Sequence, residues 1–392
     1  MKYVILRCED AGLFGEQTAP LLEGARTSHL AQLAQAGAAG VSRAGRSGAA
    51  AIDRFQLYRA LLGLSPDEAE AAAGRCCAEA AGLQLGAEET AWCCELVSQR
   101  DGVIIDPAAG RIPTKESELL IHALDETLGS DIRRWEVGQG SHHALVTQDP
   151  ALAAEGAPAV RAPELLVGQA WRKQLPKGLP GETLGALIGQ ASQLLESHPV
   201  NRVRVDLGEN PANMAWLWGA SGGAPQAAFG DRTGLSGAVV SNSFLLKGLA
   251  KTLGLGWKDA PASLKESAVK QLTKTVSSLI DTHDLVYVHV SIETGDAVER
   301  TCAMERLDQI LLKSLTEALP RIGPWRLLAA VDDLRQGIVP LIAIGSGLPQ
   351  QPVVSLSAEH LNASPLAFTD GAGLFTWFTR KSGEPEVTGA RV

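Results

Sequence analysis

The sequence predicts an α/β fold with a second domain inserted into it. Residues 2–8 form a nearly continuous apolar run, which is typical of a strand buried on both faces of a parallel sheet. After Gly237, helical segments alternate with short apolar runs, and this alternation predicts a largely parallel sheet covered by helices on both faces. From about Ala91 the residue pattern changes to short strand-like segments, which indicates a separate α+β unit in the middle of the chain.

We place the core domain at residues 1–88 and 228–392, and the inserted cap domain at residues 89–227. A chain of 392 residues is too long for one compact core, in agreement with two domains. Core helices are expected near residues 55–62, 243–253, 266–281 and 303–319, and the expected cap strands are AWCCELV, GVIID, HHALV, NRVRVDL and MAWLWG.

The charge balance limits the classes of partner. The chain carries 44 acidic and 35 basic side chains, a formal net charge of −9, which argues against nucleic acid or an anionic membrane as the main partner. No apolar run approaches the length of a membrane span. The first residues contain no small-residue cleavage site, so they are interpreted as a strand and not a signal peptide. We therefore expect a cytoplasmic protein.

Six cysteines are present, and none forms a CxxC pair. They are Cys8, Cys76, Cys77, Cys93, Cys94 and Cys302. In a large chain expected in the cytoplasm, reduced thiols are the prediction. The two adjacent doublets are able to face one another as a metal or redox site, but buried thiols acting as small apolar groups are the favoured interpretation.

Several sequence blocks are similar to one known family. The block HPVNRVRVDLGENPANMAWLWG begins at His198, and GLSGAVVSNSFLLKGLAKTLGL and HDLVYVHV follow in the same order as in that family. The chain thus resembles the archaeal-type, cofactor-independent (2,3-bisphosphoglycerate-independent) phosphoglycerate mutases of the alkaline phosphatase superfamily, over nearly its whole length. The resemblance implies an alkaline-phosphatase-like core sheet covered by helices on both faces, with an inserted α+β cap.

The resemblance also implies a chemistry. These enzymes move a phosphoryl group between the 2 and 3 positions of glycerate, with a serine nucleophile and two divalent cations held by Asp and His. A serine hydroxyl is a poor nucleophile at neutral pH, so a metal must lower its pKa. The cations also neutralise the negative charge that grows on the transferred group.

Most of the implied metal ligands are replaced. Glu9 takes the place of the first Asp, and Asp10 follows it; Asp332 matches a later Asp, and Asp333 replaces a His. Glu293 is a stray carboxylate in a shortened loop that has lost its His. We expect Glu9, Asp10, Asp332 and Asp333 to converge at strand ends, with at least one raised pKa or a bound ion. No metal cofactor is expected; the alternative is Mg²⁺ or Mn²⁺ in an all-carboxylate site, although such oxygen ligands suit Mg²⁺ better.

The nucleophile position is changed as well. Where the family has its serine, a fixed distance before LLGLSP, this sequence has Asp53 or Arg54, depending on a one-residue gap. Ser47 is the only nearby hydroxyl and lies too early for the same helix start. Ser47 and Asp53 are therefore only weak catalytic candidates, and no catalytic residue is assigned.

The substrate-binding residues implied by the resemblance are partly kept. Arg75, Asn213 and Lys247 match the family and are candidates to bind an anion through charge-assisted hydrogen bonds, or else are retained only as scaffold. The RCN motif of the family becomes Cys93-Cys94-Glu95, and the basic residue of its YRH motif becomes His142. His142, His143, His289 and His360 show no metal-ligand spacing and are interpreted as structural or surface histidines.

The favoured hypothesis is a non-catalytic binding, regulatory or scaffolding protein on a mutase fold. Its partner would be an unidentified protein or a second copy of the chain, with a small phosphate-bearing ligand as a further expectation. The alternative is an active phosphoglycerate mutase or phosphohydrolase with a rebuilt metal site. A distinct phosphate-ester enzyme is a third hypothesis, disfavoured because no phosphate-cradling P-loop is present.

Overall fold

The computed structural model describes nine stretches of the chain: residues 1–9, 25–43, 53–65, 73–153, 159–222, 226–292, 296–331, 339–368 and 371–380. They belong to two compact units. Unit 1 comprises Met1–Pro66, Ala227–Asn242 and Gly254–Val392, and unit 2 comprises Asp67–Gln226 and Ser243–Leu253. Relative to the expected boundaries, residues 67–88 and 243–253 lie with the inserted unit instead of the core.

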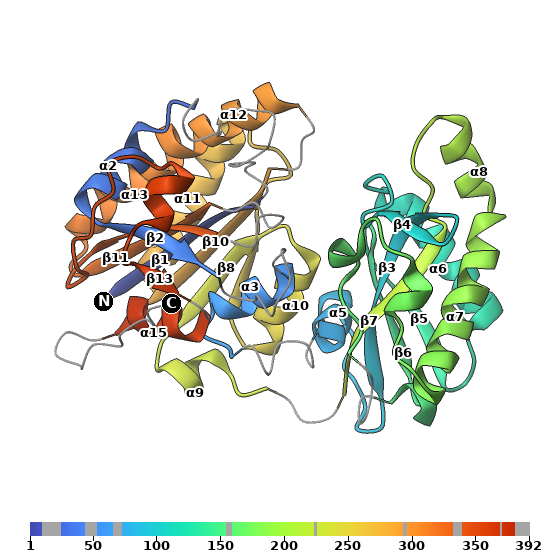
Figure 1. Cartoon of the computed structure of the whole chain (residues 1–392). Coiled ribbons are helices and arrows are strands. Elements are labelled where there is room, and N and C mark those ends of the chain that lie inside the picture. The colour runs from blue at the N-terminus through green and yellow to red at the C-terminus, as the bar shows by residue number, and fades with distance from the viewer. Residues whose placement is uncertain are drawn as a thin grey trace. The chain divides into compact units, whose positions relative to one another are not determined.

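Unit 1 is built on one eight-stranded sheet (Figure 1). Its strands in spatial order are β13 (Ala367–Phe368), β2 (Ala38–Ser42), β12 (Val339–Gly345), β11 (Trp325–Val331), β1 (Lys2–Glu9), β10 (Leu285–Ser291), β8 (Gly237–Ser241) and β9 (Gly256–Asp259). Every neighbouring pair is parallel except the two that involve β12, which runs antiparallel to β11 and β2. The predicted, largely parallel sheet is confirmed.

Helices cover both faces of this sheet (Figure 1). The larger apolar core packs against one face, under α2 (Ser28–Ala36), α11 (Glu266–Thr282), α12 (Ala297–Arg306), the π-helical turn Leu307–Leu312, α13 (Lys313–Ala318) and α14 (Ala358–Asn362). The other face carries α3 (Arg54–Ala60), α9 (Phe229–Thr233) and α15 (Gly371–Thr379). In the described part of the chain, no helix is both long and apolar enough to cross a membrane.

Unit 2 contains a five-stranded antiparallel sheet centred on β3 (Thr90–Arg100). The other strands are β4 (Val103–Asp106), β5 (Arg133–Gln139), β6 (His142–Thr147) and β7 (Met214–Ser221). In Figure 1, α5 (Ala73–Ala81) lies on one side of the sheet, and α6 (Thr114–Leu128), α7 (Leu179–Glu196) and α8 (Pro199–Asp206) lie on the other. Short 3₁₀ helices are found at Pro150–Leu152, Pro163–Leu166, Trp171–Gln174 and, in unit 1, Leu319–Arg321.

One expected cap strand was wrong. The segment NRVRVDL lies in helix α8, where Pro199 occupies the first turn and the His198 side chain accepts a hydrogen bond from the Val200 amide. The alternation of Val and Arg suggested apolar residues facing inward. Instead Arg204 is buried and Val203 and Val205 are exposed, because the Arg204 guanidinium is held by carboxylates and by backbone carbonyl oxygens.

The α10 helix (Phe244–Thr252) belongs to unit 2 because it packs closely on α5. A Cβ atom at Gly248 would lie only 1.7 Å from the carbonyl oxygen of Cys76, so only glycine permits this approach. At the end of the helix pair, Lys251 Nζ donates a hydrogen bond to the carbonyl oxygen of Glu79 at 2.8 Å. The sequence predicted the helix near residues 243–253, but nothing local in it revealed that this helix packs on α5.

A disulfide joins Cys77 on α5 to Cys93 on β3, so the expectation of reduced thiols is wrong for this pair. The two doublets do face one another, as the less favoured interpretation held. Cys76 and Cys94 are buried and take no part in a disulfide, and burial raises the pKa of the Cys94 thiol well above its usual value. The Cys94 thiol therefore stays protonated and is a poor partner for disulfide exchange.

Reducing the disulfide is expected to lower the free energy of unfolding of unit 2 by about 3 kcal/mol, because the bond closes a short loop in the unfolded chain. Urea unfolding of the full chain with and without reductant measures this change. The double variant Cys77→Ala/Cys93→Ala should lose its response to reductant, while Cys302→Ala should keep it. Equal stability in both conditions would contradict a stabilising disulfide.

Candidate functional site

The alternation of side chains along β1 separates an apolar face from a polar one. Val4, Leu6 and Cys8 point into the main core of unit 1, so Arg7 and Glu9 point to the opposite face. On the neighbouring strand, His289 pairs in register with Arg7 and therefore shares that face. Arg7, Glu9 and His289 are all almost completely buried near the carboxyl ends of their strands.

Glu9 is the centre of a group that we call the Glu9 cluster, formed by Arg7, Glu9, Arg54, Tyr58 and His289. Its carboxylate lies 2.9 Å from Arg7 Nη2 and 2.7 Å from Arg54 Nε. The Tyr58 hydroxyl donates to Oε2 at 3.2 Å, and His289 Nε2 lies 3.0 Å from the same oxygen. A buried carboxylate is thus surrounded by donors from two strands and one helix.

The hydrogen bonds fix the tautomer of His289. An ionised Glu9 carboxylate only accepts hydrogen bonds, so His289 Nε2 carries a proton and donates it. The other ring nitrogen, Nδ1, lies 2.8 Å from the hydroxyl oxygen of Ser241 on β8, which is then the donor. Three parallel strands are thereby linked through one neutral imidazole.

The charges in the cluster control its titration. Burial opposes ionisation of Glu9, but the Arg54 and Arg7 guanidiniums and the His289 hydrogen bond outweigh it and hold the Glu9 pKa well below its usual value. Burial lowers the pKa of His289, although Glu9 acts in the opposite direction. At neutral pH the cluster thus contains two guanidinium cations, one carboxylate and a neutral histidine.

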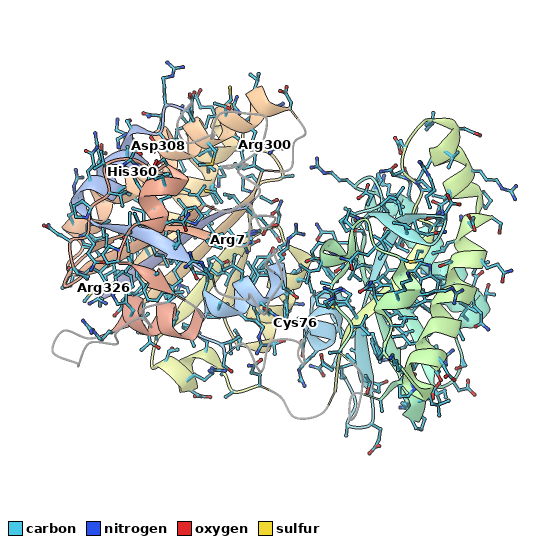
Figure 2. The ribbon with its side chains drawn as sticks, in the orientation of Figure 1. Arg7, Cys76, Arg300, Asp308, Arg326 and His360 are labelled. Carbon is cyan, nitrogen blue, oxygen red and sulfur yellow. A yellow bond between two sulfur atoms is a disulfide. The ribbon has the colours of Figure 1, made fainter. Side chains whose placement is uncertain are left out.

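Aromatic contacts with Tyr58 hold the Arg7 and His289 side chains in place. The Arg7 guanidinium stacks over the Tyr58 ring at 4.8 Å, and Figure 2 shows Arg7 inside unit 1 close to α3. The Tyr58 ring also meets the His289 ring edge to face, with 5.1 Å between the ring centres. Tyr58 therefore packs against Arg7 and His289 and also bonds to Glu9.

The structure describes the surroundings of two residues of the predicted site. Glu9, expected as a vestigial metal ligand or as part of an exposed acid pair at the strand end, is buried and therefore not exposed, and its pKa is lowered. Asp53, a weak nucleophile candidate, caps α3: its Oδ1 accepts from the Phe55 and Gln56 amides at 2.7 and 3.0 Å. Ser47 and Glu293 lie outside the described residues, as do Asp10, Asp332 and Asp333, so the predicted convergence of these last three with Glu9 stays a prediction.

The two divalent cations implied by the family do not fit the described part of this site. Among the described residues, no three His, Cys, Asp or Glu side chains gather as metal ligands. The Glu9 carboxylate, which would be the first ligand, is within 3 Å of two guanidinium groups. A dication at Glu9 would have to overcome repulsion from both in a poorly solvated environment.

The three anion-binding candidates all belong to unit 2, where they have different surroundings. The Asn213 amide accepts from the Gln99 amide at 2.8 Å and donates to the Gln99 carbonyl oxygen at 3.0 Å, which ties β7 to β3 and gives Asn213 a scaffold contact. Arg75 on α5 lies 3.9 Å from Glu79 and keeps 19% of its side chain exposed. Lys247 is half-buried on α10.

The remaining replaced residues of unit 2 are part of its packing. Cys93 is consumed by the disulfide, and the buried Glu95 carboxylate accepts a hydrogen bond from Trp218 Nε1 at 3.0 Å. His142 Nδ1 lies 3.4 Å from Glu95, and its ring stacks on Phe244. Cys93, Glu95 and His142, which replace residues of the family motifs, therefore have a structural role.

Sequence reasoning identified the position of Arg54 but missed what it contacts. It also gave Arg7, Tyr58 and His289 no part in a site. One signal was available: Arg7 is a charged residue inside an apolar strand, two positions before Glu9, so both must share a face. The contribution of α3 depends on long-range packing and had no local signature.

Comparison with known proteins places the chain in a family. The family model "2,3-bisphosphoglycerate-independent phosphoglycerate mutase" matches residues 57–201. A Methanosarcina barkeri protein of that name is 32% identical over 287 residues, 69% of each chain. The chain belongs to the family of 2,3-bisphosphoglycerate-independent phosphoglycerate mutases, as the sequence blocks indicated.

Other relatives match shorter stretches. The proteins of that name from Methanosarcina mazei and Methanosarcina acetivorans are 34% and 36% identical, over 65% and 55% of this chain. The matches span only 66% and 55% of those relatives' own lengths. The likeness in sequence is therefore partial, and it does not by itself carry the relatives' activity to this chain.

Solved structures show the same fold. The cofactor-independent phosphoglycerate mutase of Thermoplasma acidophilum superposes with a TM-score of 0.55 at 22% identity, over 96% of this chain and 98% of that one. A protein from Pyrococcus horikoshii gives a TM-score of 0.67 at 18% identity, over 98% and 99% of the two chains. The predicted fold class is thus confirmed.

Substituting Glu9→Gln is expected to lower the free energy of unfolding at pH 7 by about 3–5 kcal/mol, since it leaves the buried Arg7 without its carboxylate. A depressed carboxyl pKa stabilises the fold above the usual value of 4.5, and this contribution is lost as pH falls through the lowered pKa. Urea unfolding of the parent protein and of Glu9→Gln should therefore show a difference in the free energy of unfolding that shrinks below pH 4.5. A difference independent of pH would contradict the ion pairing.

The capping role of Asp53 predicts different effects for two substitutions. Asp53→Asn should change stability by less than about 0.5 kcal/mol, because asparagine is an equally good cap, whereas Asp53→Ala should cost about 1 kcal/mol. Thermal unfolding measures both changes. Asp53 would instead be a nucleophile if Asp53→Asn kept the stability but abolished a measurable turnover.

Proposed function

We propose that this chain is a ligand-binding, non-catalytic member of the mutase family. The observation that carries the proposal is the position of Arg54, whose guanidinium lies 2.7 Å from Glu9 at the carboxyl end of β1. According to the family resemblance, this end of the strand supplies the first metal ligand, and the start of α3 supplies the serine. Here Glu9 stands at the first position, and Arg54, one of the two residues that match the second, forms an ion pair with it.

The chemistry of phosphoryl transfer explains why this exchange matters. A serine attacks a phosphomonoester only when its hydroxyl is ionised, and a bound metal ion provides that ionisation. A guanidinium stabilises negative charge on a phosphoryl group, but it does not coordinate a hydroxyl as a Lewis acid. The described residues of the Glu9 cluster are therefore suited to hold a ligand and lack the groups that would start the reaction.

Unit 2 supports ligand binding through two basic side chains. Gly248 lies against Cys76, and Lys251 bonds to Glu79. These two contacts indicate that α10 and α5 run in the same direction. Arg75 and Lys247 therefore lie on two helices that pack on one another, one residue before Cys76 and Gly248. A pair of cations there favours a phosphate or carboxylate ligand, the groups present on a phosphoglycerate. The predicted protein partner or homo-oligomer stays a prediction.

Active mutase or phosphohydrolase chemistry is the second candidate, and the comparisons favour it. The relatives reported above, from three Methanosarcina species, are named as mutases. An active site of this kind would use Glu9, Asp10, Asp332 and Asp333 as metal ligands and Ser47 or Asp53 as nucleophile. Such a site requires Glu9 to exchange its arginine partners for a metal.

An assay of the purified chain for interconversion of 2- and 3-phosphoglycerate, with and without Mg²⁺ or Mn²⁺, decides between the two candidates. The proposal predicts no turnover above background but measurable binding of 3-phosphoglycerate by calorimetry. Binding should weaken about ten-fold or more in Arg75→Gln/Lys247→Gln, because charge-assisted hydrogen bonds are lost. The control variant Lys270→Gln, on the exposed side of α11, should bind normally.

Metal-dependent turnover would contradict the proposal. If that turnover disappeared in Asp332→Ala and in Ser47→Ala or Asp53→Asn, it would establish the second candidate and identify its nucleophile. Absence of both turnover and phosphoglycerate binding would reject both candidates.

A further inference from the structure

Helix α8, at the edge of unit 2, turns its apolar side chains outward (Figure 1). Val203 and Val205 are 57% and 58% exposed, and Leu207, directly after the helix, is 71% exposed. Arg204, between the two valines, is buried and bonded to Glu116 and to backbone carbonyl oxygens. Burial normally favours valine inside and arginine in water. Exposed apolar side chains that gather on one helix, unlike those scattered singly, indicate an interaction surface.

Two charged side chains lie between these apolar ones. At about 100° per residue, the exposed arc of α8 carries Arg202 and Asp206 at its centre. Val203 and Leu207 lie on one side of this pair, and Val205 lies on the other. Both charged side chains are exposed, and in the described part of the chain neither takes part in an ion pair. We call this arc the α8 surface, formed by Arg202, Val203, Val205, Asp206 and Leu207.

The α8 surface is complementary to itself. A two-fold axis perpendicular to the helix places a second copy antiparallel to the first, so that Arg202 faces the partner's Asp206 and Asp206 faces the partner's Arg202. The same rotation brings Val203 and Leu207 of each copy to the side of the partner's Val205. A parallel copy would instead bring like charges together. The order of charges along α8 therefore favours a second copy of this chain in the antiparallel orientation.

We propose that the α8 surface is a self-association site, at which two copies of this chain pair through antiparallel α8 helices. The two ion pairs fix the orientation, and the apolar side chains on either side supply the contact that water leaves. An eight-residue helix is only about 12 Å long, so the pair buries less than the area of about 1,000 Å² that a stable interface needs. The dimer is therefore weak and reversible.

This inference goes beyond the proposed function and does not depend on it. It gives the expected homo-oligomer a defined place on unit 2. Turnover of a phosphoglycerate would reject the proposed function without affecting the α8 surface, and a strictly monomeric chain would reject the α8 surface without affecting the proposed function.

Sedimentation velocity of the full chain, over a series from micromolar to nearly millimolar protein, measures the association. The parent should change reversibly from monomer to dimer as its concentration rises. Arg202→Asp places two acids on each copy, so like charges face one another and the dissociation constant should rise about ten-fold or more. Asp206→Arg should have the same effect, because it places two bases on each copy.

A mixture of the two charge variants gives the sharpest readout. Arg202→Asp presents only acids at the centre of the α8 surface, and Asp206→Arg presents only bases. An equimolar mixture should therefore form heterodimers at concentrations where each variant alone is monomeric. The double variant Arg202→Asp/Asp206→Arg restores opposite charges across the two-fold axis and should associate like the parent.

Further variants test the apolar contact and supply controls. Val203→Ser/Leu207→Ser leaves the charges unchanged and should also weaken the association. Two matched controls lie on unit 1: Val298→Ser, at a valine that is 70% exposed, and Lys270→Glu, in an exposed ion pair on α11. Both should associate like the parent. A monomer at every concentration, a dimer that neither charge variant weakens, or a mixture that stays monomeric would overturn the inference.

Discussion

The ion pair between Glu9 and the arginines Arg7 and Arg54 constrains the polar face of unit 1. A buried charge is tolerated only when it is paired and hydrogen-bonded, and here each partner comes from a different place: Arg7 from the same strand and Arg54 from α3. Replacing Glu9 by a neutral residue removes the carboxylate that both guanidiniums contact. The start of α3 is therefore coupled to the end of β1 by electrostatics.

In the function proposed above, the same interaction distinguishes this chain from the chemistry that the family resemblance implies. A strand-end carboxylate beside a helix start can hold a cation for catalysis, or it can be neutralised by the protein's own cations. Among the described residues, Arg7 and Arg54 neutralise the Glu9 carboxylate. The pKa of Glu9 is depressed, and the histidine next to it is neutral. The described residues surround the strand-end carboxylate with two guanidinium groups, while the fold of the family is kept.

The parallel sheet and its helices were predictable because period-2 and helical patterns are local properties of the sequence. The helical segment 199–206 was mistaken for a strand because Val and Arg alternate, and the partners that bury Arg204 are distant in sequence. Similarly, the position of Glu9 could be predicted, but its pairing with Arg54 could not, since it depends on how α3 packs on β1. The docking of α10 on α5 and the Cys77–Cys93 bond are further long-range contacts that no local pattern encodes.

The most direct test of this account is a titration of the purified chain with Mn²⁺, followed by the electron paramagnetic resonance signal of the free ion. Arginines at Glu9 should exclude the dication, so the account predicts that the free signal rises in proportion to added Mn²⁺ at micromolar concentrations. Retention of one or two tightly bound ions, released by Glu9→Gln, would contradict it. That result would mean that Glu9 leaves Arg7 and Arg54 to coordinate a metal.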